Sequence, residues 1–222
     1  MFKLDTDKVL FKNRISSGGF GSVYPYKTRD DENGLKTVVK HIKGTSVSVL
    51  IKNFSEAVIG FHCRHPSIVP ITGYCVKHKH ATDSQQSDKS QGPEEFELFL
   101  RMPRMKGNLF EYMKRIRDNS RAVPLSQIVK KFYSLASGLD YLHKKEIVHR
   151  DIKPHNILLD EKDNVLLSDV GSAMYISEDE NSNMITNIEG TKYYMAPELF
   201  NNTNKKKNKK KKIKERNWVS ID

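Results

Sequence analysis

The segment His149–Asn156, which reads His-Arg-Asp-Ile-Lys-Pro-His-Asn, carries residue types that suit acid–base and metal chemistry. Asp151 and Asn156 lie five residues apart, so a loop can turn both side chains toward one site. There the carboxylate of Asp151 would accept a hydroxyl proton, and the amide oxygen of Asn156 would bind a cation. Asp169 follows thirteen residues after Asn156 and adds a second carboxylate. With phosphate oxygens completing the coordination shell, Asn156 and Asp169 form a donor set that suits Mg²⁺.

A second group of residues, nearer the N-terminus, suits a bound phosphate. Gly18, Gly19 and Gly21 lie between two β-prone runs, where the missing Cβ lets backbone N–H groups approach an anion. A plain glycine hairpin fits the same pattern. Lys40 ends a β-branched run nineteen residues after Gly21, and a buried lysine needs a carboxylate partner, which Glu56 would supply from a predicted helix. A surface lysine and a solvated glutamate are the alternative.

A β-rich front half and a helical back half would position these two groups. Short β-prone runs between turn residues predict strands over residues 9–15, 22–24, 35–42, 68–75 and 97–102. Residues 48–63 and 126–143 carry apolar residues at helical spacing, and Ser126 is the predicted N-cap of the second helix. Residues 77–95 are polar and predict a solvated loop insertion. The change from strands to helices predicts two lobes.

The composition excludes several classes of protein. The chain has 222 residues, of which 37% are hydrophobic and 29% charged, and no apolar stretch reaches the length of about 18 residues that a membrane-spanning helix needs. Met1–Leu10 lacks the apolar core of a secretory signal. Cys63 and Cys75 are the only cysteines and cannot build a disulfide framework. We therefore expect a cytoplasmic protein rather than a secreted, fibrous or membrane protein.

The net charge of +11 comes mainly from one tract. Lys205–Lys214 contains eight lysines, and subtracting these leaves +3 for the rest of the chain. Such a run of like charges predicts a solvated tail, here the Lys/Asn-rich residues 201–222. The alternative is contact of Lys205–Lys214 with nucleic acid or another anionic surface, or with an import receptor that would bring the protein into the nucleus.

In their order, these motifs resemble those of the eukaryotic-type protein kinase domain, over residues 15–198. The matching segments are the glycine loop Ser16–Val23, the strand lysine Lys40, the helix glutamate Glu56, the loop His149–Asn156, Asp169–Gly171 for Asp-Phe-Gly, and Ala196–Glu198 for Ala-Pro-Glu. The resemblance implies an α+β, bilobal kinase-like fold. Within a kinase domain of residues 9–200, the N-lobe would cover about 9–105 and the C-lobe about 106–200. Residues 65–69 and 73–75 are also similar to the tyrosine-kinase-like group of serine/threonine kinases.

The resemblance further implies ATP and Mg²⁺ as cofactors, a protein serine or threonine as acceptor, and a role for each matching residue. Lys40, paired with Glu56, would hold the α- and β-phosphates of ATP. Asp151 would accept the substrate proton, and Lys153 would contact the γ-phosphate. Asn156 and Asp169 would hold Mg²⁺. The residues implied to line the nucleotide site are Ser16, Gly18, Gly19, Phe20, Gly21, Val23, Val38, Lys40, the gatekeeper Met102, the hinge residues Arg104 and Met105, and Leu158.

Two departures from the family pattern lead to expectations of their own. Val170 replaces the phenylalanine of Asp-Phe-Gly, and Gly60 stands where a larger helix residue would pack on it. We expect a cavity in the stack of Ile71, Gly60, Val170 and His149, which Phe61 or Phe99 would fill. Only 24 residues follow Glu198, too few for the remaining helices of a kinase C-lobe. We therefore expect a truncated domain with an incomplete helical lobe and a loosened C-terminal half.

Two other interpretations stay open at this point. The chain could be a catalytically impaired remnant, a pseudokinase that binds a nucleotide or a partner. Zinc is a further alternative, but the spacing of the histidines and cysteines fits no closed set of four ligands. The residues concerned are His62, Cys63, His65, Cys75, His78 and His80.

Overall fold

The computed structural model describes residues 4–18, 21–31, 33, 35–44, 47–79, 95–120, 122–176, 190–197 and 199. Several predictions fall outside these residues. They concern Gly19 and Phe20 of the glycine loop, Glu198, and the tail 201–222 with Lys205–Lys214. These stay predictions.

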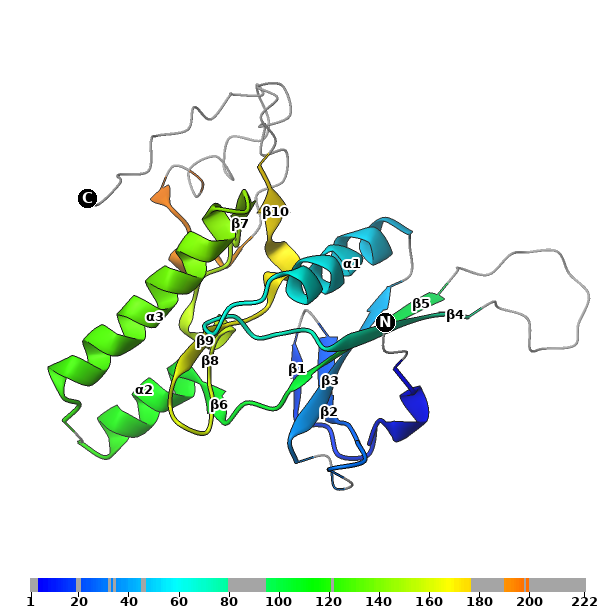
Figure 1. Ribbon diagram of the computed structural model, residues 1–222, viewed down its shortest axis with the longest axis horizontal. Coiled ribbons are helices and arrows are strands. Elements are labelled where there is room, and N and C mark those ends of the chain that lie inside the picture. Colours follow the sequence, from blue (N-terminus) through cyan, green and yellow to red (C-terminus); the bar gives the residue numbers. More distant parts are fainter. Residues whose placement is uncertain are drawn as a thin grey trace, which may run out of the picture.

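Five antiparallel strands form one sheet in the order β1-β2-β3-β5-β4 (Figure 1). The strands are β1 (Ser16–Gly18), β2 (Gly21–Pro25), β3 (Thr37–Gly44), β4 (Gly73–Lys79) and β5 (Glu95–Pro103). In the central strand β3, Lys40 lies opposite Val23 of β2 and Leu100 of β5. Helix α1 (Val47–His62) packs across one face of this sheet.

Both faces of the sheet are covered, because successive side chains of a strand point to opposite faces and the strands are apolar on both. The cluster beneath α1 consists of Ile42, Ala57, Ile71, Leu98 and Leu100. The cluster on the opposite face consists of Leu4, Val9, Tyr26, Val39 and Phe99. Leu4 and Val9 flank the short helix η1 (Thr6–Lys8), so the N-terminal segment closes the face that α1 leaves open.

The second half of the chain contains the helices α2 (Leu109–Asp118) and α3 (Leu125–His143), with short strands packed against α3 (Figure 1). One small sheet has the order β6-β8-β9, and β10 pairs with β7. These strands are β6 (Gly107–Asn108), β7 (Ile147–Val148), β8 (Ile157–Leu159), β9 (Val165–Leu167) and β10 (Met174–Tyr175). The short helices η2 (Pro154–Asn156) and η3 (Val170–Ser172) lie between β7 and β8 and between β9 and β10, and η4 (Lys192–Tyr194) follows β10. The predicted α+β architecture of a β-rich lobe and a helical lobe is confirmed.

Several element predictions are wrong in detail. No strand covers 9–15, where Val9 forms only an isolated bridge to Tyr26, and β1 begins at Ser16. The loop predicted over 77–95 is shorter, because β4 continues to Lys79 and β5 begins at Glu95.

The strand predicted over 68–75 begins only at Gly73, because Pro70 has no N–H to donate to a strand ladder. Ile68 instead forms an isolated parallel bridge to Leu167. Ser126 is not the N-cap of α3, since the helix begins at Leu125 after Pro124, which makes no side-chain cap hydrogen bond.

Helix α2 was not predicted, although its sequence contains a start signal. Asn108 accepts a hydrogen bond from the N–H of Glu111, and Glu111 accepts one from the N–H of Asn108. This reciprocal pair is a capping box, which satisfies two backbone donors at a helix N-terminus. An Asn three residues before a Glu therefore indicated the start of α2.

Candidate active site

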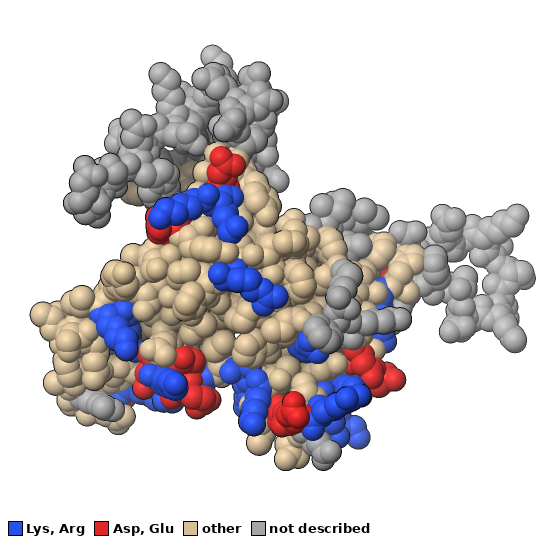
Figure 2. Space-filling view, in the orientation of Figure 1, with Lys and Arg blue, Asp and Glu red and all other residues tan. Residues whose placement is uncertain are grey.

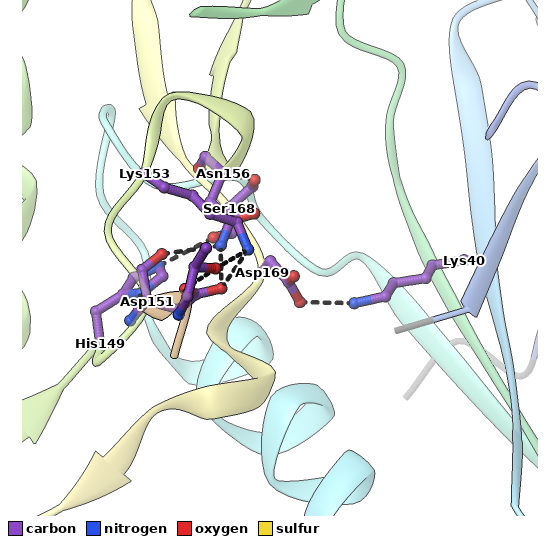
Figure 3. Close-up of polar contacts among 8 residues, drawn as sticks. Lys40, His149, Asp151, Lys153, Asn156, Ser168 and Asp169 are labelled. Carbon is purple, nitrogen blue, oxygen red and sulfur yellow. Dashed lines mark hydrogen bonds and ion pairs between the residues drawn. The ribbon is translucent and has the colours of Figure 1, made fainter. Parts of the chain in front are cut away.

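Lys40 lies at the centre of a buried ionic triad that joins the two halves of the molecule. Its Nζ lies 2.8 and 2.9 Å from the two carboxylate oxygens of Glu56 on α1. The same Nζ lies 2.8 Å from Oδ1 of Asp169, which precedes η3 in the helical lobe. Figure 3 shows Lys40 extending from β3 toward Asp169. The predicted pair of Lys40 and Glu56 is therefore present, and Asp169 is added to it.

The triad holds two carboxylates and one ammonium group in a buried place. Burial lowers the pKa of Lys40, but the charges of Glu56 and Asp169 outweigh burial and raise that pKa above its ordinary value. Burial and the charge of Asp169 raise the pKa of Glu56 above its ordinary value, although the charge of Lys40 opposes this rise. Lys40 is thus charged, and it contacts two carboxyl groups. The oxygens of Asp169 are also hard donors that a cation could bind.

Helix α1 is placed by direct contact between Gly60 and Ile71. A Cβ on Gly60 would lie 2.3 Å from Cγ1 of Ile71, and the N–H of Ile71 donates to the carbonyl of Gly60 over 3.1 Å. The expectation of a cavity here is wrong, because Ile71 occupies the space that Gly60 leaves. Phe99 does not fill it either, since its ring stacks on His41 with centroids 4.4 Å apart. Phe61 lies instead beneath the guanidinium of Arg64.

The carboxylate of Asp151 is buried, and both of its oxygens accept hydrogen bonds (Figure 3). Oδ2 accepts from Nζ of Lys153 at 2.7 Å and from Nδ2 of Asn156 at 2.9 Å. Oδ1 accepts from the N–H and the hydroxyl of Thr191, each at 2.8 Å. Burial by itself raises the pKa of Asp151, but the bonds from Lys153, Thr191 and Asn156 and the charge of Lys153 outweigh it and lower this pKa below its ordinary value. Asp151 is therefore ionised at neutral pH.

The loop that carries Asp151 is attached to the segment that carries Asp169. His149 is buried and its Nε2 donates to the carbonyl of Ser168 over 2.9 Å, while burial lowers the pKa of His149 and keeps the ring neutral. The N–H and the hydroxyl of Ser168 both donate to the carbonyl of Asn156, each over 2.9 Å. Sequence reasoning missed this role of Ser168. The only signal for it in the sequence was that Ser168 directly precedes Asp169.

Gly18 at the end of β1 and Gly21 at the start of β2 have different physical roles. Gly21 has a φ of +119°, and a Cβ there would lie 2.5 Å from the carbonyl oxygen of His41. The packing of β2 on β3 therefore requires Gly21, whether or not a ligand binds. A Cβ on Gly18 would meet no described atom within 4 Å. Among the described residues, no packing contact therefore requires a glycine at position 18.

The residues predicted to surround an adenine come from both halves of the chain. Val38 and Met102 are direct partners in the β3–β5 ladder, and Val38 is buried. Leu158 lies on β8 in the helical lobe. The N–H of Arg104 donates to the carbonyl of Lys36 over 2.8 Å. The backbone donor of Arg104 is therefore used within the protein, which argues against a bond from this atom to a base.

Two other kinds of site are absent from the described part of the chain. None of its helices has both the length and the apolar character needed to cross a bilayer. Its histidines, cysteines and acidic residues form no group of three or more that could hold a metal ion. The zinc alternative therefore has no support from the described residues.

Comparison with known proteins identifies the family. The protein kinase domain family matches residues 10–213, and the chain therefore belongs to this family. A G-type lectin S-receptor-like serine/threonine-protein kinase of Arabidopsis thaliana is 31% identical over 200 residues, which are 88% of this chain and 22% of that protein. Rust resistance kinase Lr10 of Triticum aestivum is 31% identical over 195 residues, or 86% of this chain and 28% of that protein. The chain thus spans about a quarter of the length of these two relatives.

Membership confirms the predicted bilobal kinase fold and has general chemical consequences. Protein kinase domains act on protein substrates and bind ATP together with Mg²⁺. The motif segments from Ser16 to Ala196 lie within the matched residues 10–213.

Proposed function

We propose that this chain is a serine/threonine protein kinase, which transfers the γ-phosphoryl group of ATP to a hydroxyl group of a protein. The observation that carries the proposal is the environment of Asp151, an ionised carboxylate whose Oδ1 already accepts a hydroxyl hydrogen bond from Thr191. An acceptor serine or threonine would present the same chemical group to the same carboxylate. Lys153, 2.7 Å from both Asp151 and Thr191, adds positive charge where phosphate charge would gather.

The chain's own residues divide the work of the transfer. ATP supplies the phosphoryl group and Mg²⁺ neutralises phosphate charge when both are bound. The acceptor oxygen forms a bond to the γ-phosphorus, the bond from that phosphorus to the β,γ-bridging oxygen breaks, and ADP leaves. Asp151 accepts the proton that the acceptor hydroxyl loses. Lys153 stabilises the charge that develops on the transferred group.

Asn156 and Asp169 have the donor chemistry for Mg²⁺. The Nδ2 atom of Asn156 donates to the backbone oxygen and to Oδ2 of Asp151, so its amide oxygen is the atom left to bind a cation. Asp169 shares Lys40 with Glu56 and is the less buried of the two carboxylates. Hard oxygen donors such as these favour Mg²⁺. Met105, rather than the N–H of Arg104, would bond the adenine base.

The test is phosphate transfer from γ-labelled ATP to three peptides that differ only in a serine, threonine or tyrosine acceptor. We expect transfer to serine and threonine, and a loss of about 10²- to 10⁴-fold in Asp151→Asn. Asp140→Asn is the matched control, because Asp140 is exposed and pairs with Lys144 at the surface of α3. Equal transfer by the wild type and Asp151→Asn would refute the proposal. Nucleotide binding without any transfer would support a pseudokinase instead.

A further inference from the structure

An exposed aromatic pair lies directly beside the loop of Asp151. The rings of His155 on η2 and Phe110 on α2 stack with centroids 4.4 Å apart and planes inclined by 20°. His155 is exposed, and Phe110 is 45% exposed. Met113, one turn further along α2 and on the same face as Phe110, is 54% exposed. We call the stacked pair of Phe110 and His155 the aromatic shelf.

The aromatic shelf lies within reach of a peptide whose hydroxyl group sits at Asp151. His155 follows Asp151 by four residues, so the two Cα atoms are separated by no more than about 14 Å. A bound extended peptide advances about 3.3 Å per residue. A side chain within about four positions of the acceptor can therefore rest on the shelf.

The charges around the shelf disfavour a basic side chain there. Among residues 109–116 and 152–156, Glu111 is the only carboxylate, and it is engaged in the capping box of α2. The same two segments contain Lys114 and Arg115, and Lys153, whose charge is paired with Asp151. An incoming lysine or arginine would lie near Lys114 and Arg115, whereas the nearby carboxylates of Glu111 and Asp151 already hold hydrogen bonds. An apolar or aromatic side chain would bury area against the exposed ring faces and edges.

We propose that the aromatic shelf selects the protein substrate. It favours acceptor segments with an apolar or aromatic side chain within about four residues of the phosphorylated hydroxyl, and it discriminates against lysine and arginine at that position. The proposal rests on the proposed function, in which Asp151 receives the acceptor hydroxyl. It adds the chemical class of the segment that the site accepts.

The test uses serine peptides in which each position from four before to four after the acceptor is in turn Phe, Ala or Arg. Two quantities are measured on the full chain: kcat/KM for transfer, and binding of the same fluorescently labelled peptides by anisotropy. At one position we expect Phe to exceed Ala by about 10-fold, with Arg below Ala. In Phe110→Ala and in His155→Ser, which leaves helix α2 untouched, the Phe-to-Ala ratio should fall below about 2-fold. Phe132→Ala removes an exposed ring from α3, far from the shelf in sequence, and should keep the wild-type ratio.

The two readouts separate this inference from the proposed function. Transfer that does not distinguish Phe, Ala and Arg at any position overturns the inference and leaves the kinase proposal intact. A preference for Arg, from stacking of its guanidinium on Phe110, also overturns it. If no peptide is phosphorylated, the kinase proposal fails, and the anisotropy measurements of peptide binding then test the shelf by themselves. Tighter binding of the Phe peptide that is lost in His155→Ser then supports the shelf, and equal binding refutes it.

Discussion

The β-sheet and helix α3 both carry extensive apolar surface, but only the sheet has that surface covered on both sides. One face of the sheet packs under α1 and the other under the N-terminal segment. Helix α3 packs one side onto β7 and β9, whereas its other side exposes Leu125, Phe132 and Tyr133. Figure 2 shows few charged side chains over this helix. Apolar surface that stays in water contributes nothing to folding, so the sheet should be the more stable of the two regions.

The residues of the candidate active site come from both the well-covered sheet region and the less covered α3 region. Lys40 and Glu56 belong to the region with two covered faces, whereas Asp151 and Asn156 belong to the region with α3. The triad with Asp169 joins the two regions through a buried ion pair. The geometry of phosphoryl transfer therefore depends on how firmly the less covered half is held.

The largest effect on stability should come from the covered side of α3. Leu142 is 0% exposed, and Leu142→Ala should lower the free energy of unfolding by about 2–5 kcal/mol through lost burial and a cavity. Leu125 is 74% exposed on the same helix, and Leu125→Ala should cost less than about 0.5 kcal/mol. Urea unfolding followed by circular dichroism measures both. Similar losses in the two variants would show that both sides of α3 are equally buried in solution.

Hydrogen exchange compares the two regions directly. Amides of β3 and β5 should exchange at least about 100-fold more slowly than those of the first half of α3, a difference of about 2.7 kcal/mol in opening free energy. The reason is that opening the sheet exposes two buried clusters, whereas the first half of α3 already faces water. Mass spectrometry of peptides spanning these elements gives the rates. Comparable protection would mean that a second copy or a partner covers α3 in solution.

The contact of Gly60 with Ile71 can be broken within the better-covered region. Gly60→Ala places a Cβ against Ile71 and should cost about 1–3 kcal/mol, because α1 must shift. The shift moves Glu56 away from Lys40, so phosphate transfer should fall as well. The double variant Gly60→Ala/Ile71→Ala removes the Cγ1 atom of Ile71, with which the new Cβ would clash. The double variant should be more stable than the sum of the two single effects predicts, and simple additivity would show that the two residues do not interact.

The smallest effect is expected on the uncovered side of α3. Phe132 is 68% exposed, so Phe132→Lys should change the free energy of unfolding by less than about 0.5 kcal/mol. The same change should reduce binding of a hydrophobic dye and slow aggregation, because it interrupts the exposed apolar surface. Dye fluorescence and light scattering measure these two properties. A large loss of stability would show that the Phe132 ring is covered in solution.

Local patterns were sufficient to predict the elements that carry the chemistry. The helices predicted over 48–63 and 126–143 are Val47–His62 and Leu125–His143, because helical periodicity involves residues only three or four positions apart. Local patterns failed where packing or a short element decided the outcome. The residues around Ile68 looked β-prone, but Pro70 prevents a regular ladder there. Helix α2 has only 10 residues, too few for a helical pattern of apolar residues to stand out.

By itself, the sequence determined the order of the motifs and the residues able to bind phosphate, metal and a proton. Only the tertiary structure decided which of these residues touch. Lys40 bonds Asp169 across 129 positions, and Thr191 bonds Asp151 across 40. Ile71 occupies the space beside Gly60, where the sequence suggested a cavity. The physical reason is that a hydrogen bond or a packed contact requires atoms within about 3–4 Å. That condition depends on the path of all the intervening chain, which residue spacing does not specify.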